Sequence, residues 1–171
     1  KIVSISDWVT YKMSGTMVYE HSQASETNLY DVQHKQWDED LCTLFSLFPD
    51  LLPPLAYAGT KLDPLKPAVR EALNITGPAD VLTGGADTQM AINSTAPALD
   101  DLVIVAGTTT PIVKVKNEYV LDDHQRSWTN SHLHEGEYIL EVNAGVTGLN
   151  LQRVKNLFYP KESYTVMEEE M

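Results

Sequence analysis

The sequence of 171 residues has little of what several classes of protein need. Its only cysteine is Cys42, which cannot form an internal disulfide, so a reducing, cytoplasmic compartment is favoured. No apolar run reaches about 18 residues, so no transmembrane helix is expected. The first residues, KIVSISDWVTYK, lack the long apolar core of a signal peptide.

Positive charge is scarce as well. Twelve lysines and arginines stand against 24 aspartates and glutamates, which gives a net charge of −12. The basic residues are scattered, whereas nucleic acids and anionic membranes select proteins with clustered Lys and Arg. We therefore expect neither partner. A phosphorylated ligand stays open, because backbone N–H groups and Mg²⁺ also bind phosphate.

The chain lacks several patterns that mark catalytic and metal sites. Gly-x-x-x-x-Gly-Lys-Ser/Thr, the phosphate-binding loop of P-loop kinases, is absent. The Gly-x-Ser-x-Gly setting of many serine hydrolases is absent too. His132 and His134 share one side of an expected strand, as exposed strand histidines commonly do, but no third ligand lies at a usable spacing. The sequence therefore predicts no metal site.

Strands, tight turns and helices follow one another along the chain, which predicts an α/β or α+β fold. The spacing of apolar residues, caps and prolines predicts helices over Ser6–Met13, Trp37–Phe48 and Pro67–Leu73. Ser6 is the expected cap of the first helix. After the Gly77-Pro78 pair the pattern changes to short apolar runs that end in glycine-rich turns. We place a domain boundary at this pair.

The first of these runs, Val81-Leu82, leads through Gly84 and Gly85 to Asp87 at an expected helix start. A helix N-terminus favours an ionised carboxylate, so one interpretation is that Asp87 only caps the helix. The other interpretation is that Asp87 accepts a proton from a substrate hydroxyl. The two glycines would then let the backbone approach the ligand closely.

A second apolar run, Leu102–Ala106, ends in the turn Gly107–Thr110, and Ile112–Lys116 completes a predicted hairpin. The turn is either a plain hairpin turn or a set of N–H and hydroxyl donors for phosphate oxygens. Gly145–Gly148, before a helix predicted over Leu149–Phe158, is a third turn of this kind. The three turns together indicate one polar site.

Five stretches stand in the order found in the middle of the FGGY carbohydrate kinase family, which the chain resembles over nearly its whole length. They are SDWVTYKMSG, SQASETNLYDVQHKQWDED, LLPPLAYAGTKLDPL, LTGGADTQMA and VIVAGTTTPIVKV. The resemblance implies an α/β fold with two ribonuclease H-like domains of the actin and hexokinase type, and with sugar and ATP between them. Residues 1–77 would end the first domain, and residues 78–171 would begin the second.

The resemblance also implies roles for single residues. Asp87 would be the general base for the sugar hydroxyl, and Thr88 would touch the sugar. The cofactor, ATP with Mg²⁺, would contact the other two turns through Gly107, Thr108, Gly148 and Gln152. We therefore expect ATP-dependent phosphorylation of a small sugar or polyol. Xylulose, gluconate and glycerol all stay open as substrates.

The sequence departs from the family as well. The Asp-x-Gly-Thr/Ser turn, the sugar-binding residues of the first domain and the glycine-rich adenine site are absent. We therefore expect an internal fragment with a half-built site and no turnover by itself. The alternative is a non-catalytic, sugar-responsive binding or regulatory protein on the same scaffold. Association into a homo-oligomer stays open.

Overall fold

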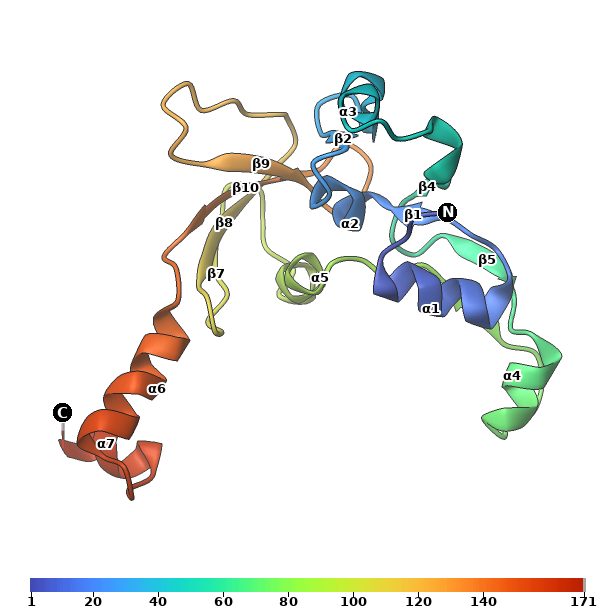
Figure 1. Cartoon of the computed structure of the whole chain (residues 1–171). Coiled ribbons are helices and arrows are strands. Elements are labelled where there is room, and N and C mark those ends of the chain that lie inside the picture. Colours follow the sequence, from blue (N-terminus) through green and yellow to red (C-terminus); the bar gives the residue numbers. More distant parts are fainter. Residues whose placement is uncertain (171) are drawn as a thin grey trace.

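The computed structural model describes residues 1–170 as helices and short strands in an open arrangement (Figure 1). The helices are α1 (Ile5–Ser14), α2 (His21–Ser25), α3 (Glu39–Leu44), the 3₁₀ turn η1 (Pro49–Leu51), α4 (Pro67–Ala72), α5 (Asp87–Ser94), α6 (Thr147–Phe158) and α7 (Tyr164–Glu170). The strands are β1 (Tyr19–Glu20), β2 (Tyr30–Asp31), β3 (Gln36–Trp37), β4 (Leu55–Ala56), β5 (Lys61–Pro64), β6 (Asp80–Leu82), β7 (Leu102–Ile104), β8 (Pro111–Lys116), β9 (Trp128–Ser131) and β10 (Tyr138–Asn143).

The first helix, α1, has a defined cap at each end. Ser4 is the N-cap, and its Oγ accepts a hydrogen bond of 3.1 Å from the N–H of Asp7. Gly15 ends the helix with φ of 98°, a left-handed conformation that suits glycine. The predicted cap, Ser6, is wrong, because Ser4 already satisfies the free N–H group. Ser6 instead lies in the first turn of the helix.

An aromatic cluster holds β1, α2 and the β2–β3 hairpin together. Tyr19, Ala24 and Tyr30 are its buried members, and the Tyr19 and Trp37 rings meet edge to face at 5.1 Å. Trp37 thus belongs to β3 and not to the helix predicted over Trp37–Phe48, so that prediction is wrong at both ends. Asp38 is instead the N-cap of α3, and its Oδ1 accepts a hydrogen bond from Leu41 N–H.

The strands β5 and β6 form an antiparallel pair that packs on α1. Their small core contains Leu62, Leu65 and Val81, with Met13 of α1 against it. Strand β6 leads directly to the Gly84-Gly85 turn and then to α5. The strand therefore fixes the start of the segment that carries Asp87.

The predicted hairpin is confirmed and belongs to a four-stranded antiparallel sheet with the order β7-β8-β10-β9. Inward residues alternate along β8, as the period of a strand requires. One face of the sheet packs against Ile92 of α5, with Val113, Val115 and Ile139 as the buried partners. Helix α5 is therefore held in place by packing on this face of the sheet.

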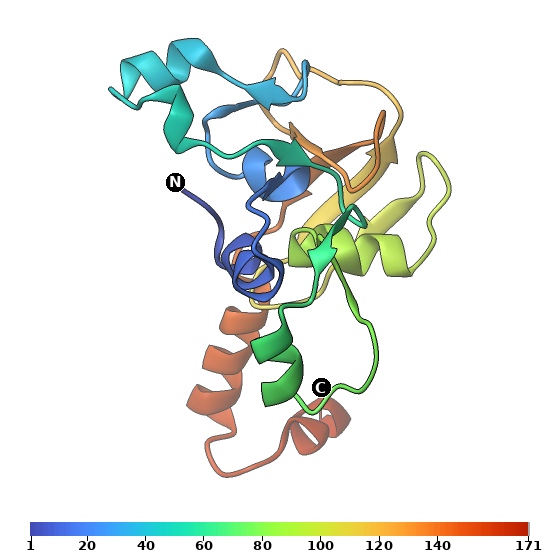
Figure 2. The same ribbon diagram turned by 90° about the vertical axis from the view of Figure 1, so that its right-hand side faces the viewer.

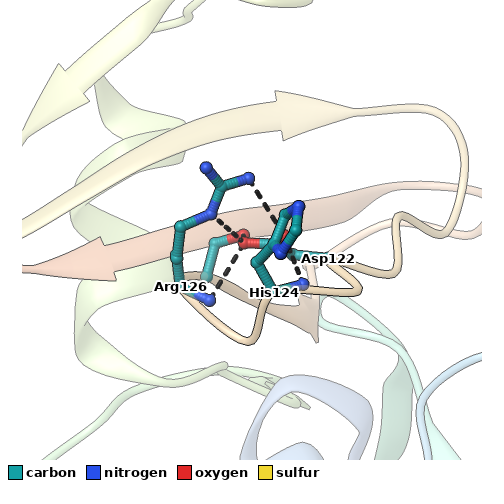
Figure 3. A network of polar contacts seen from close by, with 4 residues as sticks. Asp122, His124 and Arg126 are labelled. Atoms are coloured by element: carbon teal, nitrogen blue, oxygen red, sulfur yellow. Dashed lines mark hydrogen bonds and ion pairs between the residues drawn. The ribbon is translucent and has the colours of Figure 1, made fainter.

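The opposite face of the sheet has a shallow apolar hollow of about 400 Å³ beside the segment 117–127. This segment is folded around Asp122, whose carboxylate accepts hydrogen bonds from His124 N–H, from Arg126 N–H and from the Arg126 guanidinium (Figure 3). These donors hold the pKa of Asp122 well below its usual range. The network shapes the segment and adds no catalytic group.

Helices α6 and α7 project away from the sheet in both views (Figures 1 and 2). The helix predicted from Leu149 to Phe158 is confirmed and begins two residues earlier, at Thr147. Its apolar side chains Leu151, Val154, Leu157 and Phe158 are exposed. Across residues 1–170, none of the helices is both long and apolar enough to cross a bilayer.

Candidate active site

The turn before Asp87 has its shape because a buried leucine lies against it. A Cβ at Gly85 would stand 2.3 Å from Cδ2 of Leu133, which is 1% exposed. A Cβ at Gly84 would meet nothing within 4 Å. The next residue, Ala86, donates its N–H to Ser22 Oγ at 2.8 Å. Leu133 and Ser22 therefore fix the backbone that enters α5.

Asp87 is the first residue of α5, and its exposed side chain lines an open pocket of about 650 Å³ with a mixed polar and apolar lining that includes Ile5. The turn 85–88 forms one wall, and the opposite wall carries Ser6 of α1 together with Gln23 and Glu26. Asp87 Oδ1 accepts a 2.7 Å hydrogen bond from Thr88 N–H, and Gln23 Nε2 donates to Ser6 Oγ at 3.0 Å. The predicted pair Asp87 and Thr88 is thus brought together among groups that suit hydroxylated ligands.

Sequence reasoning missed the opposite wall, because the segment 22–27 carried no signal beyond its polarity. Glu26 is the important member. Partial burial raises the pKa of its carboxyl, a hydrogen bond from Gln89 lowers it, and the like charge of Asp87 raises it further. Its Oε1 also accepts a 3.2 Å hydrogen bond from Asn130 Nδ2 of β9. Glu26 therefore joins the pocket to the sheet.

A chain of buried polar contacts runs behind the pocket. Glu20 is 1% exposed, and its Oε2 accepts hydrogen bonds from the N–H groups of Ser22 and Gln23 at 2.9 and 3.1 Å. Its own N–H donates to Asp7 Oδ2 at 3.2 Å. Burial raises the pKa of both carboxyls. The chain continues through Ser22 Oγ to Ala86, so α1 is linked to the start of α5.

The predicted nucleotide residues form a second group, where α6 begins. A Cβ at Gly148 would lie 2.2 Å from the carbonyl oxygen of Gly107 and 3.4 Å from Cα of Thr108. The turns are also tied by two backbone hydrogen bonds, one from Thr110 N–H to Gly145 O and one from Ala144 N–H to Thr110 O. The structure therefore brings Gly107, Thr108 and Gly148 into direct contact.

The remaining predicted residue, Gln152, lies exposed one turn further along α6. The pocket around Asp87 is not lined by the turns at Gly107 and Gly148. Helix α5 lies between these two groups, because it starts in the pocket facing α1 and packs on β8 (Figure 1). The prediction that all three turns line one polar site is therefore wrong for this pocket, because α5 separates the turns. The sequence-predicted residues fall into a carboxylate group, Asp87 and Thr88, and a turn group, Gly107, Thr108, Gly148 and Gln152, on either side of α5.

The histidine pair differs from its prediction. His132 follows the end of β9 and is 2% exposed, so the expectation of exposed strand histidines is wrong for it. Burial lowers the pKa of His132 to about 4, and neighbouring His134 and Lys35 add to this effect. Among the described residues, no three His, Cys, Asp or Glu side chains gather as a metal site would require.

The comparison with known sequences decides the family. The sequence profile described as the N-terminal domain of the FGGY family of carbohydrate kinases matches residues 1–93, more than half of the chain. The chain belongs to the FGGY family of carbohydrate kinases. It is 47% identical over 168 residues to "Putative sugar kinase YoaC" of Bacillus subtilis (strain 168), covering 98% of the chain and 34% of that protein. It is 30% identical to an autoinducer-2 kinase of Photorhabdus laumondii, covering 94% of the chain and 31% of that protein.

Solved structures show that the chain has the fold of this FGGY family. Xylulose kinase from Lactobacillus acidophilus superposes with a TM-score of 0.81 at 18% identity, over 94% of this chain and 33% of that one. Plasmodium falciparum glycerol kinase, solved with ADP, gives a TM-score of 0.76 at 18% identity, over 90% of this chain and 31% of that one. The predicted α/β fold of the actin and hexokinase type is confirmed. The chain spans about a third of the length of these FGGY relatives.

The turn group offers donors of the kind that bind phosphate oxygens. In the exposed turn the N–H of Gly107 already donates to Thr109 O at 3.1 Å, so the donors that face a ligand there are the Thr108 hydroxyl and the N–H groups of Thr108 and Thr109. The twelve-residue helix α6 begins beside this turn. Gly148 lies against the carbonyl oxygen of Gly107, an approach that a Cβ at position 148 would prevent. In an FGGY chain of this composition, phosphate would therefore be held by backbone donors and a helix dipole more than by lysine or arginine.

Proposed function

We propose that this chain is the central part of a kinase that uses ATP and Mg²⁺ to phosphorylate a hydroxyl of a small sugar or polyol. The observation that carries the proposal is the position of Asp87, a carboxylate at the start of α5 in an open pocket of about 650 Å³ that also holds Ser6, Gln23 and Thr88. Membership of a carbohydrate kinase family supports it. The similar proteins include an autoinducer-2 kinase, a xylulose kinase and a glycerol kinase. Each of these names mentions a small compound.

In the proposed reaction Asp87 is the general base. Its carboxylate accepts the proton of the substrate hydroxyl while that oxygen forms the new bond to phosphorus. Thr88 and the Ser6–Gln23 pair provide hydrogen-bonding groups for the other hydroxyls of the substrate. Positioning matters most in such a reaction, because phosphoryl transfer needs little further covalent chemistry from the protein.

The turn group would hold the cofactor. ATP supplies the phosphoryl group, and Mg²⁺ neutralises the charge of its phosphates. We assign the phosphate contacts to the turn at Gly107 and Thr108 and to the start of α6 at Gly148. Gln152, one turn along the same helix, would line the nucleotide site. Mg²⁺ would enter with the nucleotide.

The proposal extends to the organisation of the parent protein. We propose that residues 1–77 and 78–171 belong to two domains that enclose the substrates, so that this chain alone does not turn over. The N-terminal-domain profile extends to residue 93, which would place the start of α5 with the first of these domains. The chain spans only about a third of its relatives, which is consistent with a site shared with further segments. Cytoplasmic location, and the lack of a nucleic-acid or membrane partner, remain predictions from composition.

The test is ADP release by the full-length parent protein across a panel of pentuloses, aldonates and polyols. Asp87→Asn keeps the size of the side chain and removes the base, so we expect sugar-stimulated ADP release to fall by roughly 10²–10⁴-fold with sugar binding retained. Asp123→Asn, at an exposed position in the segment 117–127, is the control and should retain full activity. Binding of a sugar without any stimulated release would instead support the non-catalytic, regulatory alternative.

A further inference from the structure

A lysine of the β2–β3 turn reaches the four-stranded sheet. Lys35 is half-buried, and its Nζ donates to Ser131 Oγ at 3.0 Å and to the carbonyl oxygen of Glu137 at 2.8 Å. The same Nζ lies 4.1 Å from the centre of the Tyr138 ring, within the range of a cation–π contact. These partners are about 100 positions further along the chain. Lys35 therefore links two distant segments by directed contacts.

The two oxygens that Lys35 contacts lie at the two ends of one loop. Ser131 is the last residue of β9, and Glu137 immediately precedes β10. Between them the loop turns back on itself, with hydrogen bonds from His132 N–H to Glu137 O and from Glu137 N–H to His134 O. One ammonium group thus holds both ends of the loop 132–136 in register.

This loop carries the leucine that lies against the turn before Asp87. Leu133 approaches Gly85 so closely that a Cβ there would stand 2.3 Å from its Cδ2. Ala86 follows and is held by Ser22. A shift of Leu133 therefore transfers to the backbone two residues before Asp87, because the interior around it is close-packed.

We propose that Lys35 is a positioning residue for Asp87, acting through the loop 132–136 and Leu133. The expected effect of Lys35 on kcat rests on the proposed function, whereas its expected effect on the backbone before Asp87 does not. Lys35 touches neither Asp87 nor the pocket around it. Its effect is to fix the loop whose Leu133 sets the path of the chain into α5.

The surroundings of Lys35 support a dedicated role. Burying an ammonium group costs free energy, which directed contacts must offset. Here burial lowers the pKa of Lys35 to about 8, while the charges of Glu137, Glu135 and Glu20 oppose that shift. A side chain needed only for packing would fill this space better without a charge.

The structural test uses hydrogen–deuterium exchange of the full-length parent protein, read by mass spectrometry on peptides covering residues 83–89 and 131–138. Lys35→Met keeps the stem and removes the three donors, so we expect exchange to rise roughly tenfold or more in both peptides, the loss typical of a hydrogen bond to a charged group. Lys161→Met is the control, since Lys161 is exposed in the segment between α6 and α7, away from β6 and from the loop 132–136. Faster exchange confined to 131–138 would overturn the proposal.

The kinetic test separates positioning from binding. In Lys35→Met we expect kcat to fall roughly tenfold while the KM for ATP stays unchanged, because the turn group is untouched. Lys35→Arg keeps the charge and the donors and should restore part of the loss. Ser131→Ala removes one acceptor without altering Lys35, and it should act in the same direction with a smaller effect, which covers the case of a Lys35→Met protein that does not fold.

Failure of this proposal and failure of the proposed function give different results. If Asp87→Asn abolishes turnover while Lys35→Met changes neither kcat nor exchange at 83–89, the kinase stands and the role of Lys35 is refuted. If no sugar stimulates ADP release, exchange at 83–89 still reports whether Lys35 fixes the turn before α5. An unchanged exchange rate of the peptide 83–89 in Lys35→Met refutes the proposal in either case.

Discussion

The substitution Gly85→Ala tests the contact that fixes the start of α5. The added Cβ would stand 2.3 Å from Leu133 Cδ2 and 3.3 Å from Ser22 Oγ. Ordinary carbon–carbon contacts lie at about 3.5–4.0 Å, so the leucine methyl has to recede by roughly 1.2 Å or more. Leu133 is 1% exposed and has little room to move. We therefore expect an overpacked core.

The substitution Gly84→Ala is a matched control for the loss of unfolding free energy expected in Gly85→Ala. Both Gly→Ala changes reduce the entropy of the unfolded chain by a similar amount, worth about 0.4–1 kcal/mol. Gly84 has open space around its missing Cβ, and neither glycine has a positive φ. The difference in unfolding free energy between the two variants is therefore the clash alone, about 1–3 kcal/mol.

The assay is equilibrium urea unfolding of both variants, with Leu133→Ala added for a double-mutant cycle. Leu133→Ala alone should cost about 2–5 kcal/mol through the cavity it leaves. Combined with Gly85→Ala it should cost less than the sum, because the new methyl fills part of that cavity. The reasoning is refuted if Gly85→Ala is as stable as Gly84→Ala, or if the two changes add.

Three further predictions concern nucleotide binding and pH. Gly148→Ala places a Cβ 2.2 Å from the backbone oxygen of Gly107, so α6 must move away from the turn; nucleotide titration should show ATP affinity reduced about tenfold with sugar binding unchanged. His21 and His132 have pKa values lowered to about 4, so the unfolded chain takes up protons first as the pH falls below the ordinary value of about 6.5. Each should remove about 1 kcal/mol of stability by pH 5.5, and urea unfolding of His132→Asn at pH 7.5 and 5.5 should show a smaller loss than the parent. The pKa of Lys35, lowered to about 8, has the same sign, so between pH 8 and about 10.5 the parent should gain stability relative to Lys35→Met. Both proteins share the opposing effect of Tyr19, Tyr30 and Tyr57, whose pKa values are raised by burial, so only the difference between the two profiles reports on Lys35.

The sequence predicted those elements whose signal is local. The hairpin of β7 and β8 followed from two runs of Val and Ile on either side of a Gly-Thr turn. Asp87 was expected at a helix start from the two glycines before it, and it is the first residue of α5. The small and hydroxylated residues of the three turns predicted one polar site, and the structure brings together two of these turns, at Gly107 and Gly148. Their assignment to ATP came only from the resemblance to a family.

Other features depend on contacts that periodicity cannot reveal. The apolar spacing from Trp37 to Phe48 suits a helix, but Trp37 packs with Tyr19 and Asp38 caps a shorter helix, so Phe48 is left 73% exposed. The place of Glu26 in the pocket depends on a turn more than 55 positions later in the chain. Contacts between residues so far apart in the sequence can be identified only from the folded structure.

The distance in sequence between Lys35 and Ser131 has a consequence for synthesis on the ribosome. The two residues are 96 positions apart, and at about 5–20 residues per second Lys35 leaves the ribosome roughly 5–20 s before its acceptor. During that time the nascent chain holds the β2–β3 hairpin and its aromatic cluster without the loop that completes them. Contacts of such long range also fold slowly, since closing the chain between them costs entropy first. The hairpin is therefore the segment for which a chaperone bound to the nascent chain would matter most.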